Sequence, residues 1–191
     1  MGETFENILK RYESHFNLHG TDKNTVHSYA PVYDRIFAPI RESTKTVLEI
    51  GVLTGAALVA LEDYFPNATI HGIDISFNYL SFGTDRSRIR LWNMDGTSPE
   101  TPIRLDTRFD LIIEDASHIP EHQVKSLDIF APFLTPGGTY IIEDIEGAYE
   151  KALQPQLRSV ADKHNLTMEW IDLRPVKQRN DDILAVFVKA R

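Results

Sequence analysis

Two short apolar runs in this chain each end in carboxylates. Asp115 follows the run 111–113, and the pair Glu143-Asp144 follows the run 140–142. In an open parallel sheet the carboxyl ends of neighbouring strands face one crevice, so acids that end two such strands can converge although they are far apart in the sequence. Carboxylate oxygens are hard ligands that suit magnesium, calcium or manganese. The pattern therefore predicts a divalent-metal site at two neighbouring strand ends.

Strand-like and helix-like segments alternate through most of the chain. Apolar runs of strand length occur at 47–51, 69–75, 89–93, 109–115 and 139–144, the last of them after a predicted turn at Pro136-Gly137-Gly138. Helix-like periodicity marks 4–17, 29–40, 56–65 and 121–133. This alternation predicts parallel βαβ winding. Two final strands, near 167–173 and 183–188, flank the charged turn 177–182 and should pair antiparallel.

The predicted fold class is α/β. We expect a Rossmann-like doubly wound sheet of about seven strands, mostly parallel with an antiparallel C-terminal hairpin, plus N-terminal helices. A chain of 191 residues without an internal linker predicts one domain that spans residues 1–191.

The composition narrows the classes of function. A net charge of −8 and a pI near 5.3 argue against a nucleic-acid partner, which would require a basic face. The chain has no cysteine, so a disulfide framework and a thiolate zinc site are excluded. We find no signal segment at the N-terminus and no apolar run of membrane-spanning length. These features predict a cytoplasmic protein without a membrane partner.

A glycine-punctuated loop joins the first predicted strand to its helix. Gly51 and Gly55 would let the backbone approach a bound cofactor closely, although such turns also occur for structural reasons. Asp74 ends the next strand, near the spacing at which a carboxylate grips ribose hydroxyls. Asp95 ends the strand after that, where it either meets an adenine edge or simply begins a turn before Gly96. Together these residues favour an adenosine-containing cofactor.

The same features resemble the class I S-adenosylmethionine-dependent methyltransferases over nearly the whole chain from Val47 onward. Within that superfamily, a more specific set of motifs is similar to the metal-dependent sugar O-methyltransferases of macrolide biosynthesis and, more distantly, to cephalosporin-hydroxylase-like proteins. These motifs are Gly20-Thr21-Asp22-Lys23, His27-Ser28-Tyr29, Pro31-Val32-Tyr33, Phe37-Ala38-Pro39, Asp115-Ala116-Ser117-His118 and Ile142-Glu143-Asp144.

The resemblance implies roles for individual residues. The magnesium ligands would be Asp115, Glu143 and Asp144, and His118 would be the general base. The residues that hold S-adenosylmethionine would include Glu49, Gly51, Asp74 and Asp95. The helical N-terminal segment, residues 1–45, would form part of the cofactor and substrate site and fold over the cofactor through Thr21, Lys23, Tyr29 and Tyr33.

The implied reaction is O-methylation of a sugar or another vicinal diol, in a small molecule or a glycoconjugate. An alcohol has a pKa of about 16 and histidine one of about 6.5, a mismatch of ~12 kcal/mol for complete proton transfer. His118 alone would therefore be a poor base. A divalent ion that lowers the pKa of a coordinated hydroxyl would supply the larger share of the activation, and His118 would receive the proton.

The sequence is also compatible with other functions. A catechol also offers two adjacent oxygens, but catechol enzymes have Asn at the final ligand position, where this chain has Asp144. The chain could also be a non-catalytic protein that binds an adenosine-containing ligand, or a nicotinamide-dependent oxidoreductase. His118 and His122 have zinc-like helical spacing, which we discount because Pro120 lies between them near a helix start.

Three features depart from the family pattern. Leu53 and Ala56 stand where many relatives have further glycines, and Ala116 replaces an expected glycine. The antibiotic-sugar enzymes also carry an additional N-terminal domain, where this chain has a short helical lead-in. The acceptor, the metal and the subunit number, including a homo-oligomer, are left open.

Overall fold

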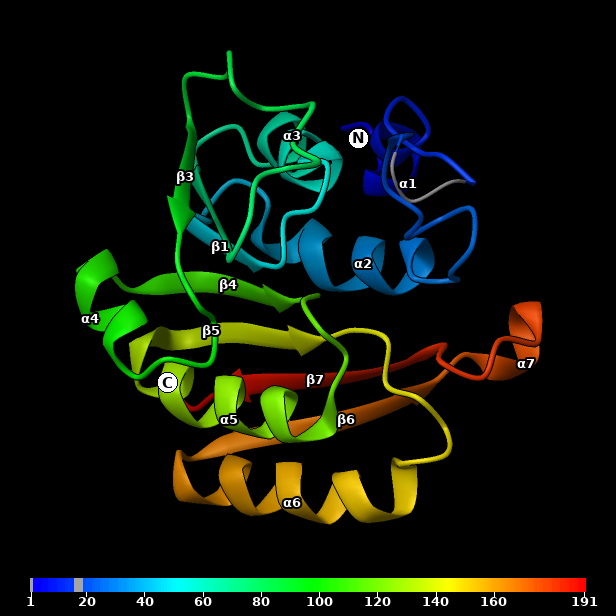
Figure 1. Cartoon of the computed structure of the whole chain (residues 1–191), viewed down its shortest axis with the longest axis vertical. Helices are drawn as coiled ribbons and strands as arrows, with labels where there is room; N and C mark the ends of the chain where they lie inside the picture. The colour runs from blue at the N-terminus through cyan, green and yellow to red at the C-terminus, as the bar shows by residue number, and fades with distance from the viewer. Residues whose placement is uncertain (1, 16–18) are drawn as a thin grey trace.

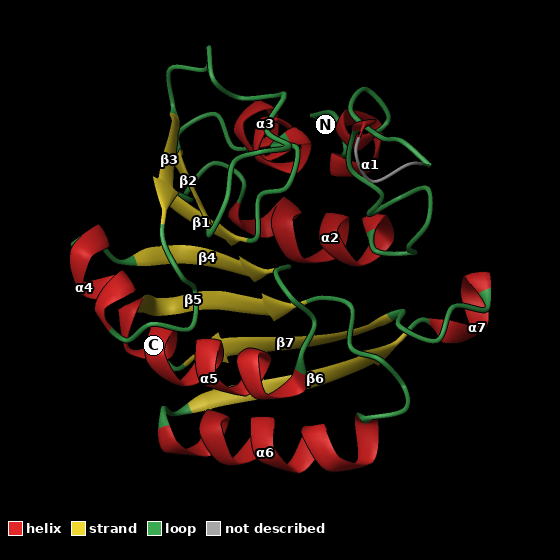
Figure 2. Ribbon diagram, viewed as in Figure 1, coloured by secondary structure: helices red, strands yellow, loops and turns green. Residues whose placement is uncertain are grey.

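The computed structural model describes residues 2–15 and 19–191, and within them the chain forms a central sheet of seven strands (Figures 1 and 2). The strands are β1 Thr46–Ile50, β2 Thr69–Asp74, β3 Ile89–Asn93, β4 Phe109–Glu114, β5 Leu134–Ile142, β6 Leu166–Asp172 and β7 Ile183–Lys189. Their spatial order is β3-β2-β1-β4-β5-β7-β6. The first five strands pair in parallel, and β7 runs antiparallel to both β5 and β6. The predicted fold class is confirmed.

Helices cover both faces of this sheet (Figure 1). One face carries α1 Phe5–Leu9, α2 Ala30–Phe37 and α3 Ala56–Tyr64. The other carries α4 Glu100–Leu105, α5 Pro120–Phe130 and α6 Glu150–Lys163. Three shorter helices complete the described elements, namely η2 Ala38–Ile40, η3 Ala131–Phe133 and α7 Arg174–Lys177.

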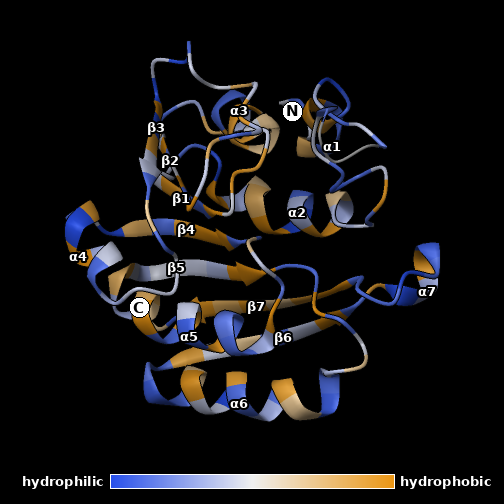
Figure 3. Cartoon of the chain, viewed as in Figure 1, coloured by the Kyte–Doolittle hydropathy of each residue, from blue (hydrophilic) through white to orange (hydrophobic). Residues whose placement is uncertain are grey.

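The two-sided cover explains why the strands read as continuous apolar runs. Along β4, Leu111 and Ile113 join the core beneath α1, α2 and α3, whereas Ile112 joins the core beneath α4, α5 and α6. All three side chains are fully or almost fully buried. A parallel sheet buried on both faces needs apolar residues at every position, which a one-sided sheet does not. Figure 3 shows β4 and β7 as mainly hydrophobic strands, and helices such as α5 and α6 that carry both hydrophilic and hydrophobic residues.

Two local predictions were wrong, and three helices were not predicted. The helix predicted over 4–17 ends at Leu9, and residues 16 and 17 lie outside the described part of the chain. After α1 the backbone instead pairs with the 20–21 segment, where Thr21 N donates to Tyr12 O at 2.9 Å. The triplet 136–138, predicted as a turn, lies within β5, whose pairing with β4 contains a register shift. Helices α4, α6 and α7 were not predicted; α6 contains an internal proline, Pro155.

The register of the parallel strands fixes where the site can form. Ile50 of β1 is paired with Ile73 of β2 and with Glu114 of β4, and Glu114 is paired with Ile142 of β5. The four strands therefore end level with one another, so the segments that follow them emerge at one edge of the sheet.

Within the described residues, no helix is both long enough and apolar enough to cross a membrane.

Candidate functional site

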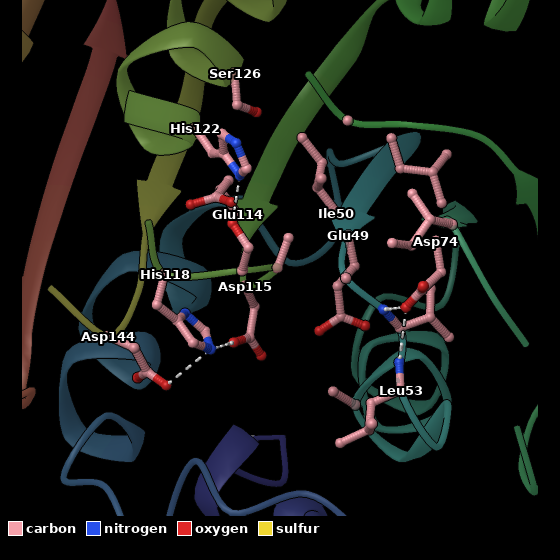
Figure 4. Close-up of a pocket in the computed structure, with 18 of the residues that line it drawn as sticks. Glu49, Ile50, Leu53, Asp74, Glu114, Asp115, His118, His122, Ser126 and Asp144 are labelled. Atoms are coloured by element: carbon pink, nitrogen blue, oxygen red, sulfur yellow. Dashed lines mark hydrogen bonds and ion pairs between the residues drawn. The ribbon is translucent and has the colours of Figure 1, made fainter. Parts of the chain in front are cut away.

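A cavity of about 640 Å³ opens at the carboxyl ends of β1, β2 and β4 (Figure 4). Its volume lies in the usual range for small-molecule sites. Eight of the thirteen predicted site residues line it, namely Thr21, Glu49, Gly51, Asp74, Asp95, Asp115, His118 and Asp144. The other five do not, and these are Lys23, Gly55, Tyr29, Tyr33 and Glu143.

Gly51 lets two loops of this edge touch through their backbones. Its φ is +92°, and a Cβ at this position would overlap the backbone oxygen of Asp115. Only glycine meets both demands, because an L side chain at positive φ is strained and has no room here. The loop that follows β1 is thereby held directly against the segment that carries Asp115.

Asp74 organises the glycine loop through its own carboxylate. Oδ2 accepts from the backbone amides of Val52 at 2.8 Å and Leu53 at 3.2 Å (Figure 4), and Oδ1 accepts from the amide of Ser76 at 2.9 Å. A carboxylate offers about four lone-pair sites, so Asp74 keeps some capacity for a ligand in the cavity. The strand-end acid thus shapes the loop that faces the ligand.

Asp95 begins a turn, as one of the two readings of the sequence predicted. Its Oδ1 accepts from the Thr97 amide at 2.7 Å and from the Thr97 hydroxyl at 2.8 Å, as expected of a turn-initiating residue. The backbone hydrogen bond from Thr97 holds the pKa of Asp95 below its usual range. Asp95 also lines the cavity, so the turn presents its carboxylate to the ligand space.

Two glutamates in the cavity wall are buried with oxygens that lack a hydrogen-bond partner. These are Glu49, with both carboxyl oxygens, and Glu114, with Oε2. Burial raises the pKa of each to about 8, and at Glu49 the nearby Lys23 ammonium opposes this rise. Sequence reasoning missed Glu114, although its position beside Asp115 at a strand end was a usable signal. Polar groups of a ligand would satisfy these oxygens.

Asp115, His118 and Asp144 form a compact cluster at one side of the cavity (Figure 4). One ligand atom of each lies within 4.8 Å of the others, and His118 Nε2 is 3.6 Å from Asp144 Oδ2 and 4.0 Å from Asp115 Oδ1. The two carboxylates are the donors that hard divalent cations prefer in proteins, and the imidazole lies beside them. The residues present therefore fit a divalent cation.

The backbone at this cluster is unusual. His118 has a φ of +56° and Asp144 a φ of +52°, both in the left-handed region. Residues with a side chain adopt this region at a cost, and such positions concentrate at functional sites. Burial, followed by repulsion from Asp115, raises the pKa of Asp144 to about 6. His118 and Asp144 thus lie beside each other despite the strained backbone at both residues and the unfavourable burial of the Asp144 carboxylate.

Glu143 faces away from this cluster, although it was predicted as the third metal ligand. Its side chain is almost fully buried, where Oε2 accepts from Lys23 Nζ at 2.7 Å and Oε1 accepts from the Tyr33 hydroxyl. Burial and repulsion from Asp144 outweigh the attraction of Lys23 and raise the pKa of Glu143 to about 7. Glu143 thus faces the N-terminal segment.

Lys23 connects three carboxylates behind the cavity wall. Besides Glu143, its Nζ donates to Asp115 Oδ2 and lies 3.6 Å from Glu49 Oε1. Burial lowers the pKa of Lys23, but the attraction of these three carboxylates outweighs it and keeps the pKa well above its usual value. The ammonium is therefore a buried, permanent positive charge at the strand ends.

Tyr29 fastens the other carboxylate of the pair. Its hydroxyl donates to Asp144 Oδ1, and its ring stacks on His27 with centroids 4.8 Å apart. His27 Nδ1 lies 3.2 Å from Oδ1 of Asp182, which is fully buried. Sequence reasoning did not single out Asp182, which lies in a charged turn and carries no spacing signal. The 20–33 segment, predicted to fold over the cofactor, packs against the strand-end carboxylates.

A second cavity, of about 570 Å³, adjoins the first. His118 and Asp144 line both cavities, so these two residues form a shared wall. The remaining lining residues are Glu146, Gln178, Arg179, Asn180 and Asp181. Arg179 and Asp181 are ion-paired at 2.6 Å, and these side chains come from the loop after β5 and the β6–β7 connection. Among the described residues that line this cavity, all are polar or charged.

Comparison with known proteins gives related sequences. Residues 47–138 match the family described as a methyltransferase domain. The chain is 33% identical over 151 residues to the 8-demethyl-8-alpha-L-rhamnosyl tetracenomycin-C 2'-O-methyltransferase of Streptomyces olivaceus, covering 71% of this chain and 38% of that protein. It is 36% identical over 134 residues to the mycinamicin VI 2''-O-methyltransferase of Micromonospora griseorubida, covering 65% and 33%. The chain thus spans little more than a third of the length of these relatives.

Solved structures share the fold. The MycE methyltransferase from the mycinamycin biosynthetic pathway, in complex with Mg, SAH and mycinamycin VI, superposes with a TM-score of 0.75 at 25% identity, covering 99% of this chain and 55% of that one. A Methanococcus jannaschii fibrillarin pre-rRNA processing protein superposes with a TM-score of 0.61 at 16% identity, covering 78% and 69%, which shows the fold alone. The chain therefore contains a match to a methyltransferase domain over residues 47–138, and in sequence and fold it is similar to sugar O-methyltransferases.

Proposed function

We propose that the chain transfers a methyl group from S-adenosylmethionine to a hydroxyl of a sugar or another vicinal diol, with a divalent cation. The observation that carries this proposal is the wall that His118 and Asp144 form between two cavities, with Asp115 beside them. A donor on one side and an acceptor on the other would meet at these three residues. Methyl transfer needs such a meeting point, because the reacting atoms must be held in line.

The larger cavity suits the donor. The Gly51 loop brings backbone close to it, and Glu49, Asp74 and Asp95 place oxygens in its wall. These acids would accept from the hydroxyl and amino groups of an adenosine-containing ligand. The MycE structure, in complex with Mg and SAH, supports this assignment.

Asp115 and Asp144 would hold the cation, with Glu143 as the third carboxylate behind them. A bound divalent cation would lower the pKa of a hydroxyl that it coordinates. The imidazole of His118 lies 3.6 Å from Asp144 and would then accept the acceptor's proton. The acceptor oxygen attacks the methyl carbon, the sulfur–carbon bond breaks, and the products are a methyl ether and S-adenosylhomocysteine.

The smaller cavity favours a sugar over a catechol. A catechol is a flat aromatic ring, which apolar and aromatic walls bind best. Glu146, Gln178, Arg179 and Asn180 instead offer donors and acceptors that match a ring with several hydroxyls. The relatives named above act on rhamnosyl tetracenomycin and mycinamicin, which supports a glycosylated acceptor.

Calorimetry and product analysis test this function. We expect the chain to bind S-adenosylhomocysteine and not NAD, which separates a methyltransferase from a nicotinamide-dependent oxidoreductase. With magnesium, S-adenosylmethionine and a panel of vicinal-diol glycosides and catechols, mass spectrometry should detect a gain of one methyl group on a glycoside, abolished by a chelator. Preference for NAD, methyl transfer that resists chelation, or methylation confined to catechols would contradict the proposal.

A further inference from the structure

Lys23 places a positive charge where a divalent cation would need negative ligands. Its side chain is only 3% exposed, and Nζ contacts Asp115 Oδ2 and Glu143 Oε2. Both acids belong to the proposed cation-binding set. The ammonium therefore already neutralises part of the charge that would attract the cation.

Both carboxyl oxygens of Glu143 are engaged by the N-terminal segment. Oε2 accepts from Lys23 at 2.7 Å and Oε1 accepts from the Tyr33 hydroxyl. Asp115 divides its carboxylate, because Oδ2 accepts from Lys23 whereas Oδ1 faces His118. A cage of three carboxylates around one cation therefore requires Lys23 to release Asp115 and Glu143.

We propose that Lys23 is a built-in competitor of the divalent cation, and that cation binding displaces its ammonium from Asp115 and Glu143. The proposal rests on the cation site of the proposed function. Two positive charges that share the same carboxylates repel each other strongly in a buried site. The cation must therefore overcome the contacts of Lys23 before it reaches its full set of ligands.

The position of Lys23 links this competition to the donor cavity. Gly20, Thr21 and Asp22, which precede it, line that cavity. The segment is tied to the rest of the chain by backbone bonds from Thr21 to Tyr12 at 2.9 Å and from Tyr29 to Lys23 at 3.1 Å. Displacement of Lys23 therefore moves a segment of the donor cavity wall, so that binding of the cation and of the donor become coupled reciprocally.

Titration with Mn²⁺ tests the competition directly, with binding followed by electron paramagnetic resonance and calorimetry. Lys23→Met keeps a stem of similar length without the charge, and we expect it to bind Mn²⁺ at least about tenfold more tightly than the wild type. Lys23→Arg keeps the charge and should show no gain. Lys151→Met removes a charge from an exposed position and is the control for net charge.

Two results would overturn the proposal. The first is unchanged or weaker Mn²⁺ binding in Lys23→Met that still binds S-adenosylhomocysteine and is therefore folded. The second, which needs no variant, is unchanged hydrogen exchange over residues 19–29 of the wild type when Mn²⁺ is added, because displacement of Lys23 should raise exchange there. Absence of Mn²⁺ binding by the wild type would instead refute the cation site of the proposed function, and the competition with it.

Discussion

The two halves of the strand edge are built in different ways. On the donor half, Asp74 and Asp95 accept hydrogen bonds from backbone amides of the loops around them, and the longest of these connections spans 22 residues. On the carboxylate half, Glu143 and Asp144 are held by Lys23, Tyr29 and Tyr33, which lie more than a hundred residues earlier. Local turns shape the first half, whereas docking of a distant segment shapes the second.

The two halves also differ in how their acidic side chains are stabilised. On the donor half, Asp74 and Asp95 accept hydrogen bonds from backbone amides, which stabilise their charged form. On the carboxylate half, side chains rather than backbone amides hold Glu143 and Asp144, and burial raises the pKa of Glu143 to about 7 and that of Asp144 to about 6. We infer that the donor half binds its ligand mainly through the shape of its loops, and that the carboxylate half attracts a cation through its negative charge.

The largest effect should come from His118. His118→Ala should leave binding of S-adenosylhomocysteine and Mn²⁺ within a few-fold of the wild type, because the donor half is untouched and both carboxylates remain. Single-turnover methyl transfer should fall about 10²–10⁴-fold, the usual contribution of a general base. The matched control is His15→Ala, at an exposed position. Near-wild-type single-turnover rates would remove His118 from the reaction.

Removal of a negative charge from the carboxylate half should weaken binding of the cation but not binding of S-adenosylhomocysteine. Asp115→Asn should weaken Mn²⁺ binding by about 100-fold, as expected for loss of a ligand. Binding of S-adenosylhomocysteine measured without a cation should change little. Asp85→Asn, at an exposed position, is the control. Equal losses of cation and donor affinity would show that the two halves are not separable in this way.

On the donor half, shape should matter more than charge. Gly51→Ala should lower the free energy of unfolding by about 2 kcal/mol or more, because positive φ is costly for alanine and the new Cβ overlaps Asp115. Gly137→Ala has a similar φ of +79° but nothing nearer than 3.6 Å, so it should cost only about 1 kcal/mol. Denaturant unfolding measures both. Equal losses would mean that the close approach at Gly51 is unimportant.

The smallest effect should be a change in pH dependence. Glu114 has its pKa raised from 4.5 to about 8 by burial, with a further contribution from Asp115, so the folded protein binds this proton more tightly than the unfolded chain. The contribution of Glu114 to the free energy of unfolding is therefore greatest below pH 4.5 and is lost as the pH rises towards 8. Glu114→Gln should flatten this decline, gaining about 1–2 kcal/mol over the wild type between pH 5.5 and 8.5. Parallel pH profiles from denaturant unfolding would contradict this.

The sequence predicted the sheet and much of the donor half because those features are local. Apolar runs, glycines and strand-end acids each carry their signal within a few residues, and parallel winding follows from their alternation. Helix α6 escaped prediction because its internal proline and weak apolar content obscured the period. The strand boundary near 136–138 failed because proline and glycine usually mark turns, whereas here they extend β5 beside a register shift.

The carboxylate half was only partly predictable. Asp115, His118 and Asp144 converge as their places after neighbouring strands indicated. The partners of Glu143, by contrast, come from the 20–33 segment, whose docking depends on long-range packing that no spacing in the sequence reveals. The same holds for Asp182 beneath His27. Buried charge networks between distant segments are the part of such a site that requires the structure.

A crystal grown with S-adenosylhomocysteine and Mn²⁺, with data collected at the manganese absorption edge, tests the central claim most directly. The account predicts one strong anomalous peak within coordination distance of Asp115 and Asp144, on the wall shared by the two cavities, with S-adenosylhomocysteine in the larger cavity. An anomalous peak elsewhere, or none while S-adenosylhomocysteine occupies its cavity, would contradict it.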